Sequence, residues 1–277
     1  KKRMVFFVTM LIFLSLTISL EQECFATSLQ NKKRTPSVTG WKDHAYKFKD
    51  NPCEKSYFQK QFKLAKVNCL KSAKKGNGTA QWIMGLMYYK GQGVNRNYHR
   101  ARKWLLLSAK SGNDRAQSLL GTIYRAGIGI KKNHSLAMHW LTQSAKAGNQ
   151  MAQFLLGDMY FSRLKVVTSK DKEKNLQLAL YWFNQSAQQG NPQAQFILGI
   201  MYWSGWRVKK DYSKALLYIR PAAKKGQIEA QYQLGLTYEY GKGVKRDMKK
   251  SIYWYKKASA QGNRQARAKL NDIFRGT

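Results

Sequence analysis

The sequence predicts an all-α protein, built as a solenoid of helix-turn-helix repeats. The main observation is a dipeptide that returns along the chain as Ala80-Gln81, Ala116-Gln117, Ala152-Gln153, Ala194-Gln195 and Ala230-Gln231, with Ala266 opening a sixth copy. Successive copies lie 36 residues apart, except for one interval of 42. A period of this size is typical of stacked supersecondary units that each pack only on their neighbours. With 43% apolar residues in 277, the chain can bury a substantial core. We therefore look for function on a surface rather than in a cleft.

Residues 1–26 have the layout of a secretory signal peptide. Three basic residues at positions 1–3 precede the sixteen uncharged residues from Val5 to Leu20, and the small-residue tripeptide Cys24-Phe25-Ala26 follows. The apolar stretch is shorter than the roughly 20 residues that cross a bilayer, so we expect cleavage after Ala26. A retained membrane anchor is the alternative; a lipoprotein is disfavoured because Glu23, before Cys24, is not small. The repeats are therefore expected outside the cytoplasm, periplasmic or secreted.

Two short segments separate this leader from the repeats. Residues 27–50 are rich in Ser, Thr and Lys and lack an apolar period, which predicts a flexible linker. Residues 51–79 predict an N-terminal helical cap with a half-repeat, because Ala65, Ala73 and Gly76-Asn77 keep the spacing of the later copies.

Each full repeat opens with one predicted helix. Ala80, Met84 and Tyr88 fall on one side of such a helix, and Gly85 lies beside them. A mid-helix Gly costs about 1 kcal/mol relative to Ala, so its return in every copy predicts a close helix crossing. The expected N-caps are Asn77, Asn113, Asn149, Asn191 and Asn263. The predicted repeats are 80–115, 116–151, 152–193, 194–229 and 230–262, followed by a capping helix at 263–277.

A second helix follows a Gly-rich turn in each repeat. Its expected N-caps are Asn97, Asn133, Asn175, Asp211 and Asp247. A Trp or Tyr then stands three residues after a small residue, as in Ala101 and Trp104, and we interpret this aromatic as a core residue. The helix closes at a Gly, such as Gly112.

Two copies depart from this pattern. The third lacks the Gly turn and carries six extra residues, so we expect residues 165–174 to bulge outward as a loop. A tolerated insertion is favoured there over a binding loop. The fourth copy has Gly205-Trp206-Arg207-Val208, which predicts a distorted turn.

The complete pattern is A-x-x-x-L-G-x-x-Y-x-x-G-x-G-V, then a capped helix with A-x-x-W and a closing Gly-Asn. It resembles the Sel-one-like repeat family, relatives of the tetratricopeptide repeats, over five copies from Ala80 to about Gly262. The resemblance implies a right-handed α/α superhelix that acts as an adaptor for protein complexes. Exported bacterial proteins of this kind are often linked to host-cell entry, intracellular survival or control of cell-wall enzymes, so the resemblance also implies host interaction or cell-envelope regulation.

A partner is expected on the concave face. The tetratricopeptide arrangement places offsets +2, +6, +9 and +10 from the repeat Ala there, and the helical wheel gathers the same positions. The main side chains of this predicted groove are Trp82, Leu86, Tyr89, Arg125, Phe154, Asp158, Phe161, Phe196, Ile200, Trp203, Tyr232, Leu236, Glu239 and Tyr240. Such a surface suits an extended peptide or an amphipathic helix. The alternative is that superhelical winding buries some of these side chains against the next repeat.

The formal net charge of +36 predicts an anionic partner surface. Removing the leader lowers it only to +35, because three basic and two acidic residues are lost. Cations follow the Gly turns as a predicted basic edge of Arg96, Lys131, Lys132, Lys209, Lys210, Lys245 and Arg246. Other cations, near helix C-termini, are explained in part by the helix dipole. Export disfavours nucleic acid, so anionic lipid or a cell-wall polymer is the expected electrostatic target.

Two cysteines, Cys53 and Cys69, follow the leader. One continuous helix through both would hold the thiols about 24 Å apart, too far to bridge. A disulfide therefore requires a turn near residues 57–61. Because the half-repeat alignment begins its helix at about Gln61, we favour two short helices joined by a Cys53–Cys69 bridge.

No catalytic constellation stands out. His134 and His139 lie five residues apart and would diverge on a helix. Ser72 and Lys75 match the S-x-x-K string of penicillin-recognising enzymes without the companion motifs, so such a hydrolase is the weakest alternative. We expect no enzyme activity, cofactor or metal. The sequence predicts a monomeric scaffold for a protein or peptide partner, with a binder of peptidoglycan or anionic lipid as the alternative.

Overall fold

The computed structural model describes residues 51–164 and 168–275. This part consists of thirteen helices, α2 to α14, and contains no strand, which confirms the predicted all-α fold. The predicted signal peptide and linker at residues 1–50 lie outside the described residues. None of the described helices is both long enough and apolar enough to cross a membrane.

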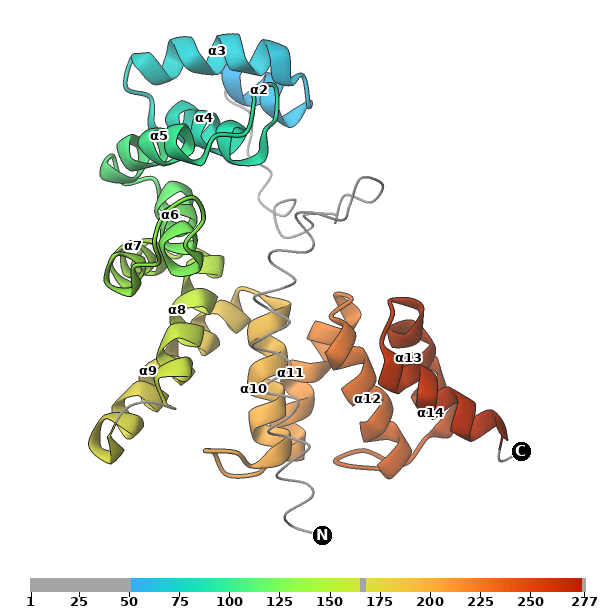
Figure 1. The fold of residues 1–277 in the computed structure, drawn as a ribbon. Coiled ribbons are helices and arrows are strands. Elements are labelled where there is room, and N and C mark those ends of the chain that lie inside the picture. Colours follow the sequence, from blue (N-terminus) through green and yellow to red (C-terminus); the bar gives the residue numbers. More distant parts are fainter. Residues whose placement is uncertain (1–50, 165–167, 276–277) are drawn as a thin grey trace. The chain divides into compact units, whose positions relative to one another are not determined.

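The helices follow one another as antiparallel pairs from the N-terminal cap to the C-terminus (Figure 1). The first helices of the five repeats are α4 (Gly78–Lys90), α6 (Asp114–Ala126), α8 (Gln150–Arg163), α10 (Pro192–Ser204) and α12 (Ile228–Tyr240). The second helices are α5 (Tyr98–Lys110), α7 (His134–Lys146), α9 (Ser169–Gln188), α11 (Tyr212–Lys224) and α13 (Met248–Ala260). The ends are formed by α2 (Pro52–Phe58), α3 (Phe62–Lys74) and α14 (Arg264–Arg275). Each helix packs mainly on the helices that precede and follow it.

Local signals set most helix boundaries as predicted. The Asn77 side chain accepts a hydrogen bond from the backbone N–H of Ala80 at 2.8 Å, and every later first helix is capped in the same way. In the fifth repeat the cap is Gln227, which replaces Asn and bonds to Ala230. Glycines end most first helices in the left-handed conformation, beginning with Gly91 at φ +72°.

The mid-helix glycines mark close crossings within each repeat, as predicted. A Cβ atom on Gly85 would lie 2.6 Å from the Leu105 side chain, and one on Gly235 would lie 2.5 Å from the Tyr255 ring. The aromatic residues three positions after the small residue of the second helix are half-buried, and those of the first four repeats, such as Trp104, pack against the core. The core therefore runs between the two helices of each pair.

The inserted residues of the third repeat correct one prediction. From Ser169 onward they are helical, so they extend the N-terminal end of α9 rather than bulge as a loop. Asn175, predicted to be an N-cap, lies inside this helix, where its side-chain amide donates to the carbonyl of Asp171 at 2.7 Å. The insertion contains neither Gly nor Pro, and its Lys and Glu residues favour helix. Residues 165–167 lie outside the described residues.

The turn of the fourth repeat corrects another prediction. Gly205 and Arg207 have φ values of +75° and +60°, close to the +72° and +67° of Gly91 and Gly93 in the first repeat. The turn therefore keeps its regular backbone, and Arg207 takes a left-handed conformation that belongs to Gly in the other Gly turns.

The N-terminal cap consists of two short helices joined near Lys60, which has φ +62°. A disulfide connects Cys53 on α2 to Cys69 on α3, with the Cα atoms 4.5 Å apart. This is the arrangement that the sequence analysis favoured.

Candidate binding surfaces

The predicted groove is carried by the first helices, and four of its side chains are closed to a partner. The exposed fractions are 5% for Trp82, 6% for Phe154, 3% for Phe196 and 7% for Ile200. The Arg115 guanidinium, on the next first helix, lies 5.2 Å from the centre of the Trp82 ring. The prediction that these four side chains are open anchors is therefore wrong. Arg115 of the next repeat covers Trp82, as the alternative interpretation allowed, whereas Phe154 packs 6.0 Å from the Phe183 ring of its own repeat.

The other groove residues keep some exposure. Tyr240 is 54% exposed, and the half-buried members are Leu86, Tyr89, Arg125, Asp158, Phe161, Trp203, Tyr232, Leu236 and Glu239. The Tyr89 ring packs 5.7 Å from that of Tyr98, and Trp203 packs 5.9 Å from Tyr212. These aromatic side chains are thus held in place by the second helix of their own repeat.

Charged groove residues pair from one repeat to the next. Arg125 on α6 and Asp158 on α8 form an ion pair at 2.5 Å. Lys269 on α14 pairs with Glu239 on α12 at 2.9 Å. Because both pairs join successive first helices, they link neighbouring repeats along this face. Sequence reasoning identified three of these four residues but not their partnerships, and it missed Lys269.

A polar cluster surrounds Glu239 at the C-terminal end. The hydroxyl of Tyr255 donates to the Glu239 carboxylate, and Lys269 also donates to the Tyr240 hydroxyl at 2.9 Å. Burial alone would raise the pKa of Glu239, but hydrogen bonds from Tyr255 and Lys269 outweigh it and lower that pKa. Burial raises the pKa of Tyr255, and the bond to Glu239 adds to the rise. The carboxylate is therefore stabilised in its charged form.

All seven residues of the predicted basic edge are exposed. The Arg96 guanidinium lies 5.6 Å from the Tyr98 ring centre, and Lys210 lies 5.0 Å from that of Tyr212. Beside the first Gly turn, Arg96 joins Lys66 and Arg100 around a surface hollow of about 500 Å³. The edge thus presents cations to solvent, and aromatic rings partly fix two of them.

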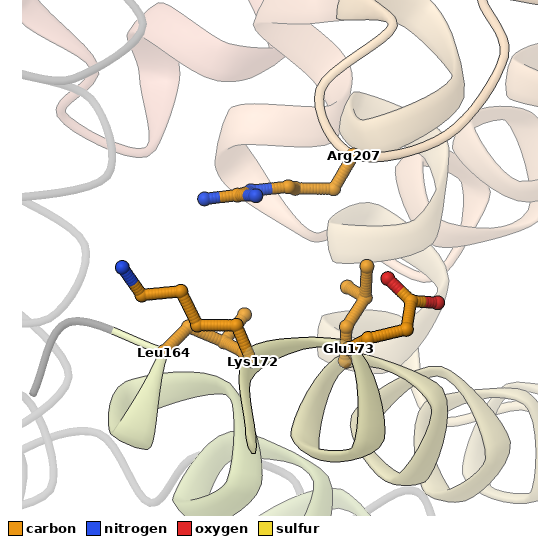
Figure 2. A pocket seen from close by; sticks show the side chains of 5 residues that line it. Leu164, Lys172, Glu173 and Arg207 are labelled. Atoms are coloured by element: carbon orange, nitrogen blue, oxygen red, sulfur yellow. The ribbon is translucent and has the colours of Figure 1, made fainter. Parts of the chain in front are cut away.

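A second hollow, which we call the α9 hollow, lies between the third and fourth repeats. It measures about 170 Å³ and is lined by Leu164, Lys172, Glu173, Leu176 and Arg207. Figure 2 shows Arg207 reaching over the hollow from the turn after α10, while Lys172 and Glu173 rise from α9 on the other side. Sequence reasoning missed this site, although it singled out both segments that form it.

The two catalytic possibilities receive no geometric support. Ser72 lies in the last turn of α3 and Lys75 is its C-cap, so the S-x-x-K string marks a helix end. Among residues 51–164 and 168–275, no three His, Cys, Asp or Glu side chains gather as metal ligands would.

Comparisons with known proteins identify the same five helix-pair repeats. A family model described as Sel1 repeat matches residues 78–113, 114–149, 150–191, 192–227 and 228–263. These boundaries begin two residues before the predicted ones, where each first helix starts. A search of curated proteins finds no match.

Two solved structures are similar over most of the chain. A Sel1 repeat protein from Oxalobacter formigenes is 32% identical with a TM-score of 0.67, over 77% of this chain and 83% of that one. The Escherichia coli protein c5321 is described as a protective antigen of uropathogenic strains with an SLR fold. It is 33% identical with a TM-score of 0.66, over 77% of this chain. The present chain spans only 44% of the c5321 chain.

Proposed function

The chain belongs to the Sel1 repeat family, a family of protein-interaction scaffolds, and we propose that it binds an extended peptide or an amphipathic helix of a partner protein. The proposed site is the open part of the predicted groove, towards the C-terminal repeats. We propose further that the chain acts as an exported monomer.

The observation that carries this proposal is the group of aromatic side chains that remain accessible. Trp203 is half-buried against Tyr212, Tyr232 packs 5.7 Å from Tyr255, and Tyr240 is mostly exposed. Aromatic side chains already held in position lose little conformational entropy when a partner binds. Such residues commonly supply much of the binding energy at protein interfaces.

Export is proposed from the leader sequence, and the disulfide supports it. A Cys53–Cys69 bridge persists most readily in an oxidising compartment such as the periplasm or the extracellular space. In that setting we propose a role in host interaction or cell-envelope regulation. The description of the E. coli relative as a protective antigen is consistent with the first of these.

The alternative function is binding of peptidoglycan or anionic lipid through the basic edge. The exposure of all seven cations favours it, as does the net charge of +36. Screening by salt would weaken this binding strongly, whereas aromatic contacts in the groove respond less.

Affinity capture from an envelope extract of the source cell, at two salt concentrations, tests both functions. The first variant is Trp203→Ala with Tyr240→Ala, and the second is Lys209→Gln with Lys210→Gln. Loss of a captured protein in the first variant supports the groove. Loss in the second, together with sensitivity to salt, supports the basic edge. If neither variant alters capture while both keep the wild-type helical content, both assignments are wrong.

A further inference from the structure

One wall of the α9 hollow is Arg207, which stands where three other repeats have Gly. Thirteen residues after the repeat Ala, the first, second and fifth copies have Gly93, Gly129 and Gly243, each with positive φ. A Cβ atom on Gly93 would lie 2.6 Å from the carbonyl oxygen of Phe62. On Gly129 it would lie 2.6 Å from the Cβ of Tyr98. The preceding second helix thus leaves no room for a side chain at this position.

In the fourth repeat Arg207 occupies this position, and the preceding second helix is α9, which the insertion lengthens. Allowing for the six extra residues, Leu176 of α9 aligns with Tyr98 and Tyr212. The added helical turns of α9 place Lys172 and Glu173 beside it. Arg207 keeps φ +60°, a backbone conformation that Gly adopts at no steric cost and an L-residue does not. A conformation disfavoured in this way is a reason to look for a function of the side chain.

The two cationic side chains of the α9 hollow form no ion pair within the described part of the chain. The three ion pairs found there involve neither Lys172 nor Arg207. The Arg207 guanidinium lies 5.6 Å from the Trp206 ring centre, which leaves its N–H groups available. The Glu173 carboxylate accepts a bond from Gln177 at 3.1 Å. Leu164 and Leu176 form apolar walls, and both are buried.

The size and the net charge of the α9 hollow favour a small group with one negative charge. The hollow of about 170 Å³ has room for a few water molecules or the end of one side chain, because a water occupies about 30 Å³ in the liquid. Two cations and one carboxylate leave one net positive charge, which a monoanion neutralises. A phosphate dianion would exceed this charge and meet stronger repulsion from Glu173 than a monoanion does. The planar guanidinium fork of Arg207 matches a carboxylate in two-point contact.

We propose that the α9 hollow binds one carboxylate of a protein partner, the side chain of an acidic residue, between Arg207 and Lys172. This inference rests on the proposed scaffold function, because it assigns a chemical requirement to the partner. Glu173 accepts a backbone N–H or an amine next to the bound carboxylate. The partner segment therefore carries an acidic residue that reaches the junction of the third and fourth repeats.

The test is a titration followed by NMR at the Nε–Hε group of Arg207, with acetyl-Gly-Glu-Gly-amide as probe. Acetyl-Gly-Gln-Gly-amide and inorganic phosphate, at equal ionic strength, are the comparison ligands. We expect saturable shifts with the Glu peptide, binding at least tenfold weaker with the Gln peptide, and weaker binding of phosphate than of the Glu peptide. Equal binding of the two peptides would overturn the proposal, as would preference for phosphate.

Variants locate the site through backbone amide shifts around Leu164 and Leu176. Arg207→Gly restores the residue found in the other Gly turns and should weaken binding at least tenfold, and Lys172→Gln at least threefold. Lys103→Gln on α5 removes the same charge from an exposed position and should leave binding unchanged. Equal losses in all three variants would mean nonspecific attraction and sink the proposal. If the Glu peptide does not bind in the α9 hollow but the Trp203→Ala, Tyr240→Ala variant still loses the captured partner, the carboxylate proposal is wrong and the proposed scaffold function stands.

Discussion

The side-chain amide of Gln195 donates a hydrogen bond to the carbonyl oxygen of Ala187 at 3.0 Å, joining α10 to the end of α9. The same bond occurs in every repeat, at 3.0 to 3.2 Å, from Gln81, Gln117, Gln153, Gln195 and Gln231. Each Gln is buried and each acceptor lies in the last turn of the preceding second helix, where carbonyl groups lack partners within the helix. The repeated Ala-Gln dipeptide is therefore a structural link between repeats.

We expect Gln195→Ala to lower the free energy of unfolding by about 1 to 2 kcal/mol, because a buried hydrogen bond is lost and a carbonyl loses a partner. Urea denaturation followed by circular dichroism measures the change. Gln143→Ala, on the exposed side of α7, is the matched control and should have little effect. Equal changes in the two variants would contradict the role of the link.

Arg207→Gly should raise the free energy of unfolding by about 1 kcal/mol, because Gly adopts the left-handed conformation without steric cost. The converse change, Gly93→Ala, should lower it, since the added Cβ meets Phe62 at 2.6 Å. Thermal melts of the two variants beside the wild type provide the measurement. A destabilised Arg207→Gly variant would show that the side chain contributes to stability rather than to binding.

Reduction of the Cys53–Cys69 bridge should loosen the N-terminal cap selectively. The loop closed by the bridge has 16 residues, for which loop-closure entropy predicts about 3 kcal/mol. Amide hydrogen exchange in α2 and α3 should therefore accelerate by about a hundredfold in a reductant, while exchange in α12 stays unchanged. The Cys53→Ser variant should match the reduced protein. Uniform acceleration over all the helices would argue that the cap is not an independent unit.

The free energy of unfolding should fall at acid pH, because the Glu239 carboxylate becomes protonated. Its pKa is lowered in the folded state, so its stabilising contribution is complete above the unfolded value of about 4.3. The contribution is lost as the pH drops through the lower folded pKa. Melting temperatures between pH 7 and pH 3 should therefore decline more steeply for the wild type than for Glu239→Gln. Asp272→Asn, an exposed change on α14, should keep the wild-type slope; parallel curves for wild type and Glu239→Gln would refute the assignment.

Much of the fold could be predicted because its signals are local. Asn77 caps a helix three residues before Ala80, Gly91 ends that helix, and Gly85 marks a crossing within the same repeat. Each relation spans a few residues or one helix pair, and the 36-residue period repeats it. The Cys53–Cys69 disulfide could be predicted for the same reason, since only a turn near Lys60 brings the thiols together.

The binding surfaces were less predictable, because they depend on how one repeat meets the next. A helical wheel places Trp82 on the inner face, but it contains no information about Arg115, which covers that ring from the following repeat. The pairing of Arg125 with Asp158 likewise depends on the stacking of α6 on α8. Such contacts join residues about one period apart, where sequence spacing alone does not specify which side chains meet.

The amino-acid sequence by itself determined the helix pairs, their caps and turns, and their order along the chain, because these follow from backbone preferences over a few neighbouring residues. Only the tertiary structure decided which inner-face aromatics stay open. It also showed that the insertion continues α9 as helix and that Arg207 faces Lys172 across a hollow. These outcomes depend on the packing of successive repeats, where the room left by one side chain sets what its neighbour can do.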